Sequence, residues 1–210
     1  MRLHAIPHST NVHRVRLALA LKGLDDVEVV QHPAGDRSGV RAVSGQDLVP
    51  VLETDAGEVL TDSMPIVAWI DATWPDPHPL YPADERARRE VQAFIDFFNF
   101  VWKVPPNAID AADPGDPRIP GWREQLRAWP VGFDALLADR PFLLGDRVGA
   151  ADVCAYPFLR FATSVDPDDD DLFHGILIDA LSEAPPPRLT AWIDRMSRLS
   201  PALAGPIANL

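Results

Sequence analysis

The chain has 210 residues, of which 47% are hydrophobic and 24% charged, a balance typical of a globular protein rather than a disordered one. Its 19 basic and 31 acidic side chains give a formal net charge of −12, which disfavours nucleic acid and anionic membranes as partners. No run of 18 apolar residues predicts a membrane span, and the polar residues after Pro7 break any signal-peptide core. A single cysteine excludes a disulfide framework. We therefore expect a cytoplasmic protein.

The first third of the chain alternates predicted strands and helices. Residues 2–6 predict a strand, and the Ala- and Leu-rich stretch 12–22 predicts a helix that ends at Gly23. Residues 27–31 predict the next strand, which completes a βαβ unit. The remaining predicted elements are a loop or weak helix over 32–47, strands over 49–53 and 58–61, and a helix over 64–73 that Asp62 and Ser63 cap.

A proline-rich stretch divides the chain, because residues 74–82 hold four prolines and cannot form a helix or a central strand. Everything after this stretch has a helical pattern. The first predicted helix runs from Asp84, which is expected to cap it, to about Lys103. Further helices are predicted over 122–137, 150–163, 172–181 and 188–197, with a loop over 105–121. The sequence therefore predicts a small α/β domain over 1–76, a linker over 77–83 and an all-α domain over 84–210.

Four segments resemble the glutathione transferase superfamily in their order and spacing, and together they span almost the whole chain. They are Ser9–Leu19, which is similar to the S-x-x-x-x-R-V-R-x-A-L stretch of the serine-type classes, Val49–Leu52, Asp62–Ile66, and the pair Ala151-Asp152 with the later Pro187–Met196. The resemblance implies an α/β thioredoxin-like N-terminal domain followed by an all-α helical C-terminal domain. It also implies a homodimer.

The resemblance implies that Val49, Pro50, Asp62 and Ser63 bind glutathione. In the family the bond before Pro50 is cis, which turns the Val49 backbone toward the tripeptide as an added strand would lie. Ser63 stands at a helix N-terminus, where free N–H groups favour an anion such as the γ-glutamyl carboxylate. Asp62 is expected to bind the γ-glutamyl amine. The competing interpretations are an edge strand at Val49 and plain helix capping by Ser63.

The catalytic residue is implied by exclusion within the family, whose members stabilise the glutathione thiolate with tyrosine or serine or use a cysteine. The two tyrosines and Cys154 lie in the proline-rich stretch and the helical domain, away from the end of the first strand. Ser9 is therefore expected to donate its hydroxyl to the thiolate, aided by the N-terminus of its helix. Asn11, where some serine-type members have cysteine, is the second candidate. Either residue could instead merely cap the helix.

One position departs from the family pattern. Leu48 stands where relatives often have a lysine, glutamine or arginine before the Val-Pro pair, and an apolar side chain cannot bind the glycyl carboxylate. His32, Arg37 and Gln46 are alternatives among which spacing does not choose. The departure also leaves open whether the physiological thiol is glutathione.

The helical part contributes further expectations. The resemblance implies that Phe97 and Val101 line a hydrophobic co-substrate site, although core packing would also explain most aromatic side chains of that helix. Asp152 is expected to be structural, because in the family an acidic residue here caps a buried helix. The acidic run 166–171 lacks the glycine and terminal glutamate of a calcium loop and is expected to be a solvated loop. No metal and no cofactor are expected, glutathione being a co-substrate.

The expected function is that of a transferase that joins glutathione, or a related thiol, to a small hydrophobic electrophile. A thiol-dependent cis–trans isomerase of the zeta type is an alternative, since the S-x-x-x-x-R-V-R start is similar to that class. Asn11 replaces the cysteine of that class, and residues 201–210 lack its ending, so transfer is preferred. A non-catalytic interaction module with the same fold is a third possibility.

Overall fold

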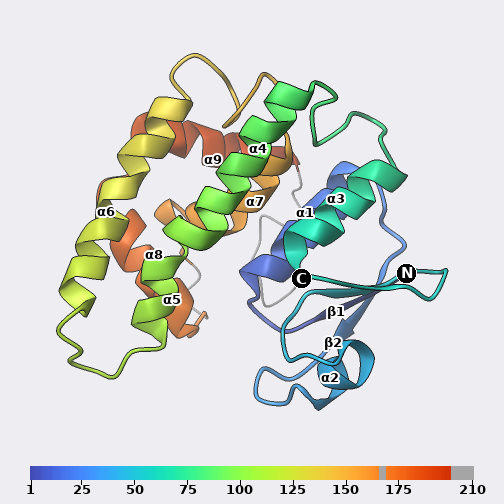
Figure 1. Ribbon diagram of the computed structural model, residues 1–210. Helices are drawn as coiled ribbons and strands as arrows, with labels where there is room; N and C mark the ends of the chain where they lie inside the picture. Colours follow the sequence, from blue (N-terminus) through green and yellow to red (C-terminus); the bar gives the residue numbers. More distant parts are fainter. Residues whose placement is uncertain (166–168, 200–210) are drawn as a thin grey trace. The chain divides into compact units, whose positions relative to one another are not determined.

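The computed structural model describes residues 1–165 and 169–199, and these form two compact units built on Met1–Tyr81 and Pro82–Ser197 (Figure 1). Part of the acidic run and the C-terminal residues 201–210, both considered above, lie outside the described residues. In the described part of the chain, no helix is long and apolar enough to cross a membrane.

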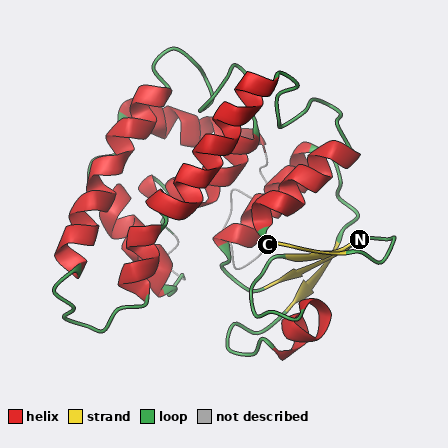
Figure 2. Ribbon diagram, in the orientation of Figure 1, coloured by secondary structure: helices red, strands yellow, loops and turns green. Residues whose placement is uncertain are grey.

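The first unit is a four-stranded sheet with helices on both faces. The strand order is β2-β1-β3-β4, with β1 parallel to β2 and antiparallel to β3, and β3 antiparallel to β4. Helices α1 and α3 pack together on one face and α2 lies on the other (Figure 2). The elements are β1 (Arg2–Ala5), α1 (Thr10–Leu21), β2 (Glu28–Gln31), α2 (Ser38–Ser44), β3 (Val51–Glu53), β4 (Val59–Thr61) and α3 (Ser63–Thr73).

Alternation along the strands explains how this sheet is covered. Leu3 and Ala5 are buried, whereas His4 between them points to the opposite face and bonds Glu53 of β3 and His32, which directly follows β2. Residues 32–47, predicted as a loop or weak helix, contain the short helix α2, which ends at Gly45 with φ of 74°. A glycine adopts this left-handed conformation without strain. The predicted thioredoxin-like arrangement is confirmed.

The proline-rich stretch after α3 is held on the first unit by a buried ion pair. Lys22 Nζ lies 2.7 Å from Asp71 Oδ1 and donates to the carbonyl oxygen of His78 at 2.7 Å. The same carboxylate accepts the backbone N–H groups of Leu80 and Tyr81 at 2.7 and 3.0 Å. Residues up to Tyr81 are therefore anchored to the helices of the first unit.

The regular elements of the second unit are all helical in its described residues, as predicted, and one isolated β-bridge joins Phe142 to Gly145. Its elements are α4 (Glu85–Phe97), a π-helical turn (Phe98–Trp102), α5 (Val104–Asp110), α6 (Ile119–Leu136), α7 (Ala150–Leu159), a 3₁₀ turn (Arg160–Ala162), α8 (Leu172–Leu181) and α9 (Pro187–Leu199). Asp84 caps α4 as predicted, with its carboxylate 2.9 Å from the Ala87 nitrogen. Phe98 anchors an aromatic core, its ring centroid 4.4 Å from Trp102 and 5.5 Å from Phe158.

One prediction for this unit is wrong, and another needs a refinement. The loop expected over 105–121 contains α5 and the start of α6, because Pro105 and Pro106 lie in the first turn of α5, where no N–H group is needed. The helix predicted to run to about Lys103 does stay helical to Trp102, but it changes after Phe97 to a π-helical turn in which the Lys103 nitrogen donates to the Phe98 oxygen.

Candidate thiol-binding site of the first unit

The strand register gathers three of the predicted segments at one edge of the sheet. His4, Val51 and Thr61 pair across β1, β3 and β4 in a single row. Immediately beyond this row the chain leaves β1 toward α1, enters β3 from the Val49-Pro50 pair, and leaves β4 into α3. The antiparallel pairing therefore brings the segment at Ser9 to the same edge as the segments at Val49 and Ser63, which follow it by 40 and 54 positions in the sequence.

Ser9 stands at the junction of β1 and α1 and caps this helix. Its backbone is extended, and its Oγ accepts the N–H of Val12 at 3.3 Å. A hydroxyl that accepts one hydrogen bond still has a proton to donate. The capping interpretation of Ser9 is confirmed, and its remaining proton lies where the partial positive charge of the helix N-terminus favours an anion.

A buried arginine connects the two helix starts. Arg14, only 1% exposed, donates from Nη1 to Asn11 Oδ1 and to Ser63 Oγ, each at 3.2 Å. The motif quoted above contains Arg14, but no local pattern marked it as part of a site. Only a contact spanning 49 positions reveals its link to Ser63.

The expected capping of α3 by Asp62 and Ser63 is wrong. Asp62 occupies the position before the helix with φ of 65°, and its exposed carboxylate makes no capping hydrogen bond. Ser63 is already the first helical residue, and its hydroxyl oxygen accepts from Arg14 instead. The first N–H groups of α3 thus have no side-chain cap from Asp62, an arrangement suited to an external anion.

The Val49-Pro50 bond is cis, as the family resemblance implies. Pro50 is buried, and the pair directly precedes β3. Leu48 beside it is 64% exposed, so it offers apolar surface where a polar group was expected. Arg37 and Gln46 each bury one side-chain nitrogen for which the described residues provide no hydrogen-bond acceptor.

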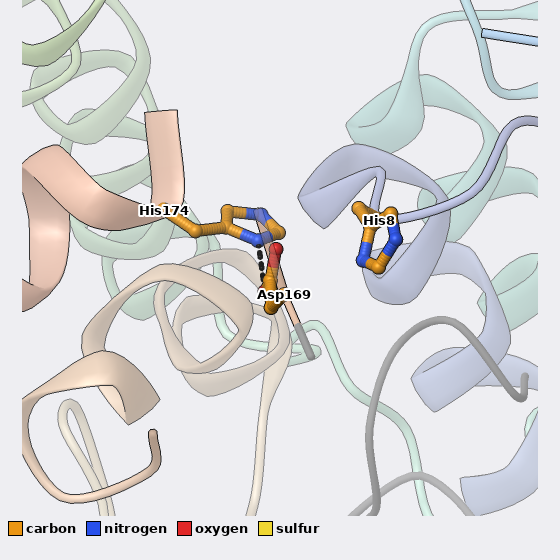
Figure 3. Close-up of side chains that lie close together, drawn as sticks. All are labelled: His8, Asp169 and His174. Carbon is orange, nitrogen blue, oxygen red and sulfur yellow. Dashed lines mark hydrogen bonds and ion pairs between the residues drawn. The ribbon is translucent and has the colours of Figure 1, made fainter. Parts of the chain in front are cut away.

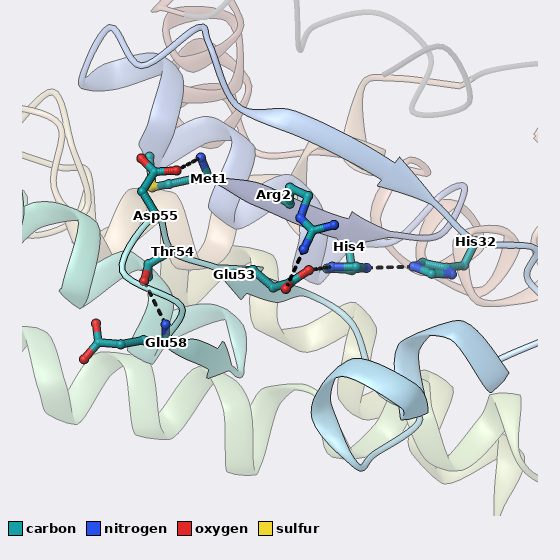
Figure 4. Close-up of polar contacts among 8 residues, drawn as sticks. All are labelled: Met1, Arg2, His4, His32, Glu53, Thr54, Asp55 and Glu58. Atoms are coloured by element: carbon teal, nitrogen blue, oxygen red, sulfur yellow. Dashed lines mark hydrogen bonds and ion pairs between the residues drawn. The ribbon is translucent and has the colours of Figure 1, made fainter.

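His32, the third alternative for the glycyl carboxylate, belongs to a polar network across the sheet (Figure 4). Glu53 Oε1 lies 2.6 Å from His4 Nε2, His4 Nδ1 lies 2.9 Å from His32 Nε2, and Arg2 donates to Glu53 Oε2 at 2.9 Å. The hydrogen bond with His4 is the main cause that lowers the pKa of Glu53. Burial, followed by the charge of His4, lowers the pKa of His32. The sequence prediction missed this network, although Arg2, His4 and Glu53 lie on the neighbouring strands β1 and β3 and His32 directly follows β2.

The predicted co-substrate residues lie at the end of α4 and on the π-helical turn that follows it. The ring of Phe97 packs 4.9 Å from that of Trp129, while Val101 is 44% exposed on the π-helical turn. Phe97 thus serves the packing of the second unit, and Val101 presents an apolar side chain at its surface.

Asp152 is a structural centre of the second unit. Its buried carboxylate accepts from the backbone N–H groups of Leu143 and Gly149 at 3.0 and 2.9 Å and from Trp192 Nε1 at 2.8 Å. Burial raises the pKa of Asp152 to about 6, against the opposing effect of these donors. These contacts join α7 to α9 and to the turn before α7.

The described end of the acidic run is more ordered than the expected solvated loop. Asp169 Oδ2 lies 2.6 Å from His174 Nδ1, and Figure 3 shows the ring turned toward this carboxylate. Asp171 caps α8 by accepting the His174 backbone N–H at 3.3 Å. Residues 166–168 lie outside the described residues.

Comparisons with known proteins agree with this architecture. A family model of the glutathione S-transferase N-terminal domain matches residues 3–78, and one of the C-terminal domain matches residues 116–195. The maleylacetoacetate isomerase of Pseudomonas aeruginosa is 30% identical over 184 residues, which cover 79% of this chain and 85% of the relative. The maleylpyruvate isomerase of a Ralstonia species is 35% identical over 96 residues, 44% of each protein.

A solved structure supports the fold independently. The holo structure of a maleylpyruvate isomerase, a bacterial zeta-class glutathione S-transferase, has a TM-score of 0.76 at 23% identity and covers 100% of this chain and 98% of its own. Together with the two matching domain families, these likenesses identify the chain as a member of the glutathione transferase superfamily.

Proposed function

We propose that this protein is a glutathione-dependent enzyme that stabilises the thiolate of glutathione, or of a related thiol, for attack on a small hydrophobic electrophile. The observation that carries the proposal is the strand register, which brings the starts of α1 and α3 and the cis Val49-Pro50 bond to one edge of the sheet. Two helix N-termini at one edge favour a ligand with two anionic groups, a thiolate and a carboxylate.

Each part of the thiol has a proposed partner. Ser9 donates to the thiolate, with Asn11 as a second donor, because only the thiolate is a competent nucleophile. The Val49 backbone pairs with the cysteinyl residue, and Ser63 with the start of α3 binds the γ-glutamyl carboxylate. The exposed carboxylate of Asp62 suits the γ-glutamyl amine.

The glycyl carboxylate needs a different partner in this chain, since Leu48 cannot bind it. We assign it to Arg37 and Gln46, whose buried nitrogens lack an acceptor among the described residues. His32 is less suitable because its Nε2 is occupied by His4. Phe97 and Val101 are proposed to contact the electrophile.

The reaction after thiolate attack can be transfer or isomerisation. Both begin when the thiolate adds to an electrophilic carbon. A transferase keeps the new C–S bond in its product. An isomerase lets the adduct rotate about its former double bond, expels the thiolate and regenerates glutathione. The names of the relatives from Pseudomonas aeruginosa and Ralstonia favour isomerisation as the second candidate, while Asn11 in place of the cysteine of the zeta class favours transfer.

Two measurements test these proposals. Isothermal titration with glutathione should give saturable binding, and an absence of binding to glutathione or another low-molecular-weight thiol would remove the enzyme proposal in favour of an interaction module. Turnover should then be followed with an aryl halide and with maleylpyruvate while free thiol is counted. Consumption of one thiol per product indicates transfer, and no consumption indicates isomerisation.

The protein is further proposed to act as a homodimer in the cytoplasm, as the family resemblance implies. Light scattering in dilute solution should give twice the chain mass of 23.1 kDa. A mass near that of a single chain would contradict the dimer.

A further inference from the structure

Arg14 occupies an unusual place for a guanidinium group. It lies on α1, is 1% exposed, and donates from one nitrogen to two side chains that belong to different helix starts, Asn11 and Ser63. A charged side chain is almost never fully buried unless its donors are engaged. Its position therefore needs an explanation beyond helix packing.

The chemistry of arginine identifies the atoms that face it. A guanidinium group has donors and no acceptor, so the atom of Asn11 at 3.2 Å must be the amide oxygen. By the same argument the hydroxyl of Ser63 accepts from Arg14 with its oxygen. Both partners can otherwise act as donor or acceptor, since an amide can flip and a hydroxyl can rotate.

This contact determines what the two side chains can offer to a ligand. When the amide oxygen of Asn11 is held by Arg14, its NH₂ group points to the other side as a donor. When the oxygen of Ser63 accepts from Arg14, its proton is left for a further acceptor. We propose that Arg14 is a positioning residue that fixes Asn11 and Ser63 as hydrogen-bond donors, so that the site selects the anionic groups of its thiol ligand.

The inference rests on the proposed function and adds to it the residue that sets the polarity of the site. Arg14 itself need not touch the ligand. Without it, either side chain could turn an oxygen lone pair toward a thiolate or carboxylate, which would repel the anion. A hydrogen bond to a charged group contributes about 1.5–3 kcal/mol, so losing the preset donors should weaken thiol binding about tenfold to hundredfold.

The test compares Arg14→Met, which removes the donors but retains much of the buried volume, with Arg14→Lys, which retains a charge and donors. Arg16→Met is the matched control, because Arg16 lies on the same helix and is half-buried. For each variant, titration gives glutathione affinity and thiolate absorbance against pH gives the pKa of the bound thiol. We expect Arg14→Met to weaken binding at least tenfold and to raise the bound thiol pKa by about one, Arg14→Lys to recover part of both, and Arg16→Met to change neither.

A second variant covers the case in which Arg14→Met fails to fold. Asn11→Asp keeps the size of the side chain and its contact with Arg14, but replaces the NH₂ donor by an oxygen. The pKa of the bound thiol should rise in Asn11→Asp. In the double variant Arg14→Met/Asn11→Asp, the loss of glutathione affinity should be smaller than the sum of the losses in the two single variants.

The outcomes separate this inference from the proposed function. If wild type binds glutathione while Arg14→Met and Asn11→Asp leave affinity and thiol pKa unchanged, the positioning role is wrong and the proposed function stands. Suppose that an Arg14→Met protein of normal stability loses glutathione affinity without any change in the pKa of the bound thiol, and that Asn11→Asp also leaves this pKa unchanged. Arg14 then does not fix Asn11 and Ser63 as hydrogen-bond donors, and the inference is wrong. If wild type binds no thiol, both proposals are overturned.

Discussion

Asp152 allows two opposing effects on a buried carboxyl group to be weighed by experiment. Burial raises its pKa from 3.8 to about 6, although three N–H donors within 3.0 Å favour the charged form. Between these two pH values the folded state binds a proton that the unfolded state has released. Stability should therefore fall as pH rises from about 4 to about 6, by about 3 kcal/mol for a pKa difference of this size.

Asp152→Asn isolates this contribution because asparagine has the same shape and does not titrate. The NH₂ group of the asparagine can face the Gly149 N–H, which leaves two donors pointing at each other. The variant should therefore be less stable than wild type at pH 4, by about 1–3 kcal/mol for a buried unsatisfied donor. The stability of wild type relative to the variant should then decline by about 3 kcal/mol between pH 4 and pH 7. Above pH 6 the two proteins should be similar in stability, or the variant should be the more stable.

Urea unfolding, followed by circular dichroism at several pH values between 4 and 7, measures this difference. Asp139→Asn, which alters an exposed aspartate of the same unit, is the control and should show no such trend. If the difference in free energy of unfolding between wild type and Asp152→Asn does not change with pH, the three donors fully offset the effect of burial on the pKa of Asp152. If wild type instead becomes more stable relative to the variant as pH rises, the three donors lower the pKa of Asp152 and the reasoning is refuted.

Three further predictions concern the first unit. Ser9→Ala should reduce the rate about 10²–10³-fold and raise the pKa of bound glutathione, measured by thiolate absorbance. If this pKa is unchanged in Ser9→Ala and raised in Asn11→Ala, Asn11 rather than Ser9 is the main donor to the thiolate. Asp71→Ala should destabilise the protein by about 3–5 kcal/mol in urea unfolding, because it leaves a buried ammonium group without its carboxylate; a loss under about 1 kcal/mol would contradict this. Gly39→Ala should lower the thermal midpoint and shift the imidazole NMR signals of His32, since a Cβ would lie 2.6 Å from that ring; unchanged spectra would count against the close approach.

The sequence alone predicted those features that depend on residues within a few positions of one another. The residue pattern located α1, with Gly23 after it, and also β2 and α8, and the residue types of Ser9 and Asp84 before helical stretches indicated helix caps. One failure was also local in origin. Proline was interpreted as a loop signal at Pro105 and Pro106, although the first turn of a helix tolerates it.

Tertiary structure decided which buried polar groups meet. Arg14 bonds Ser63 across 49 positions, Asp152 accepts from Trp192 across 40, and His4 lies within hydrogen-bond distance of both His32 and Glu53. No pattern in the sequence selects such partners, because the choice depends on sheet register and helix packing rather than on local propensity. The sequence determined an α/β unit followed by helices and the segments that resemble a thiol site. Only the fold brought those segments to one edge of the sheet, because the antiparallel pairing of β3 with β1 and β4 sets where each segment begins.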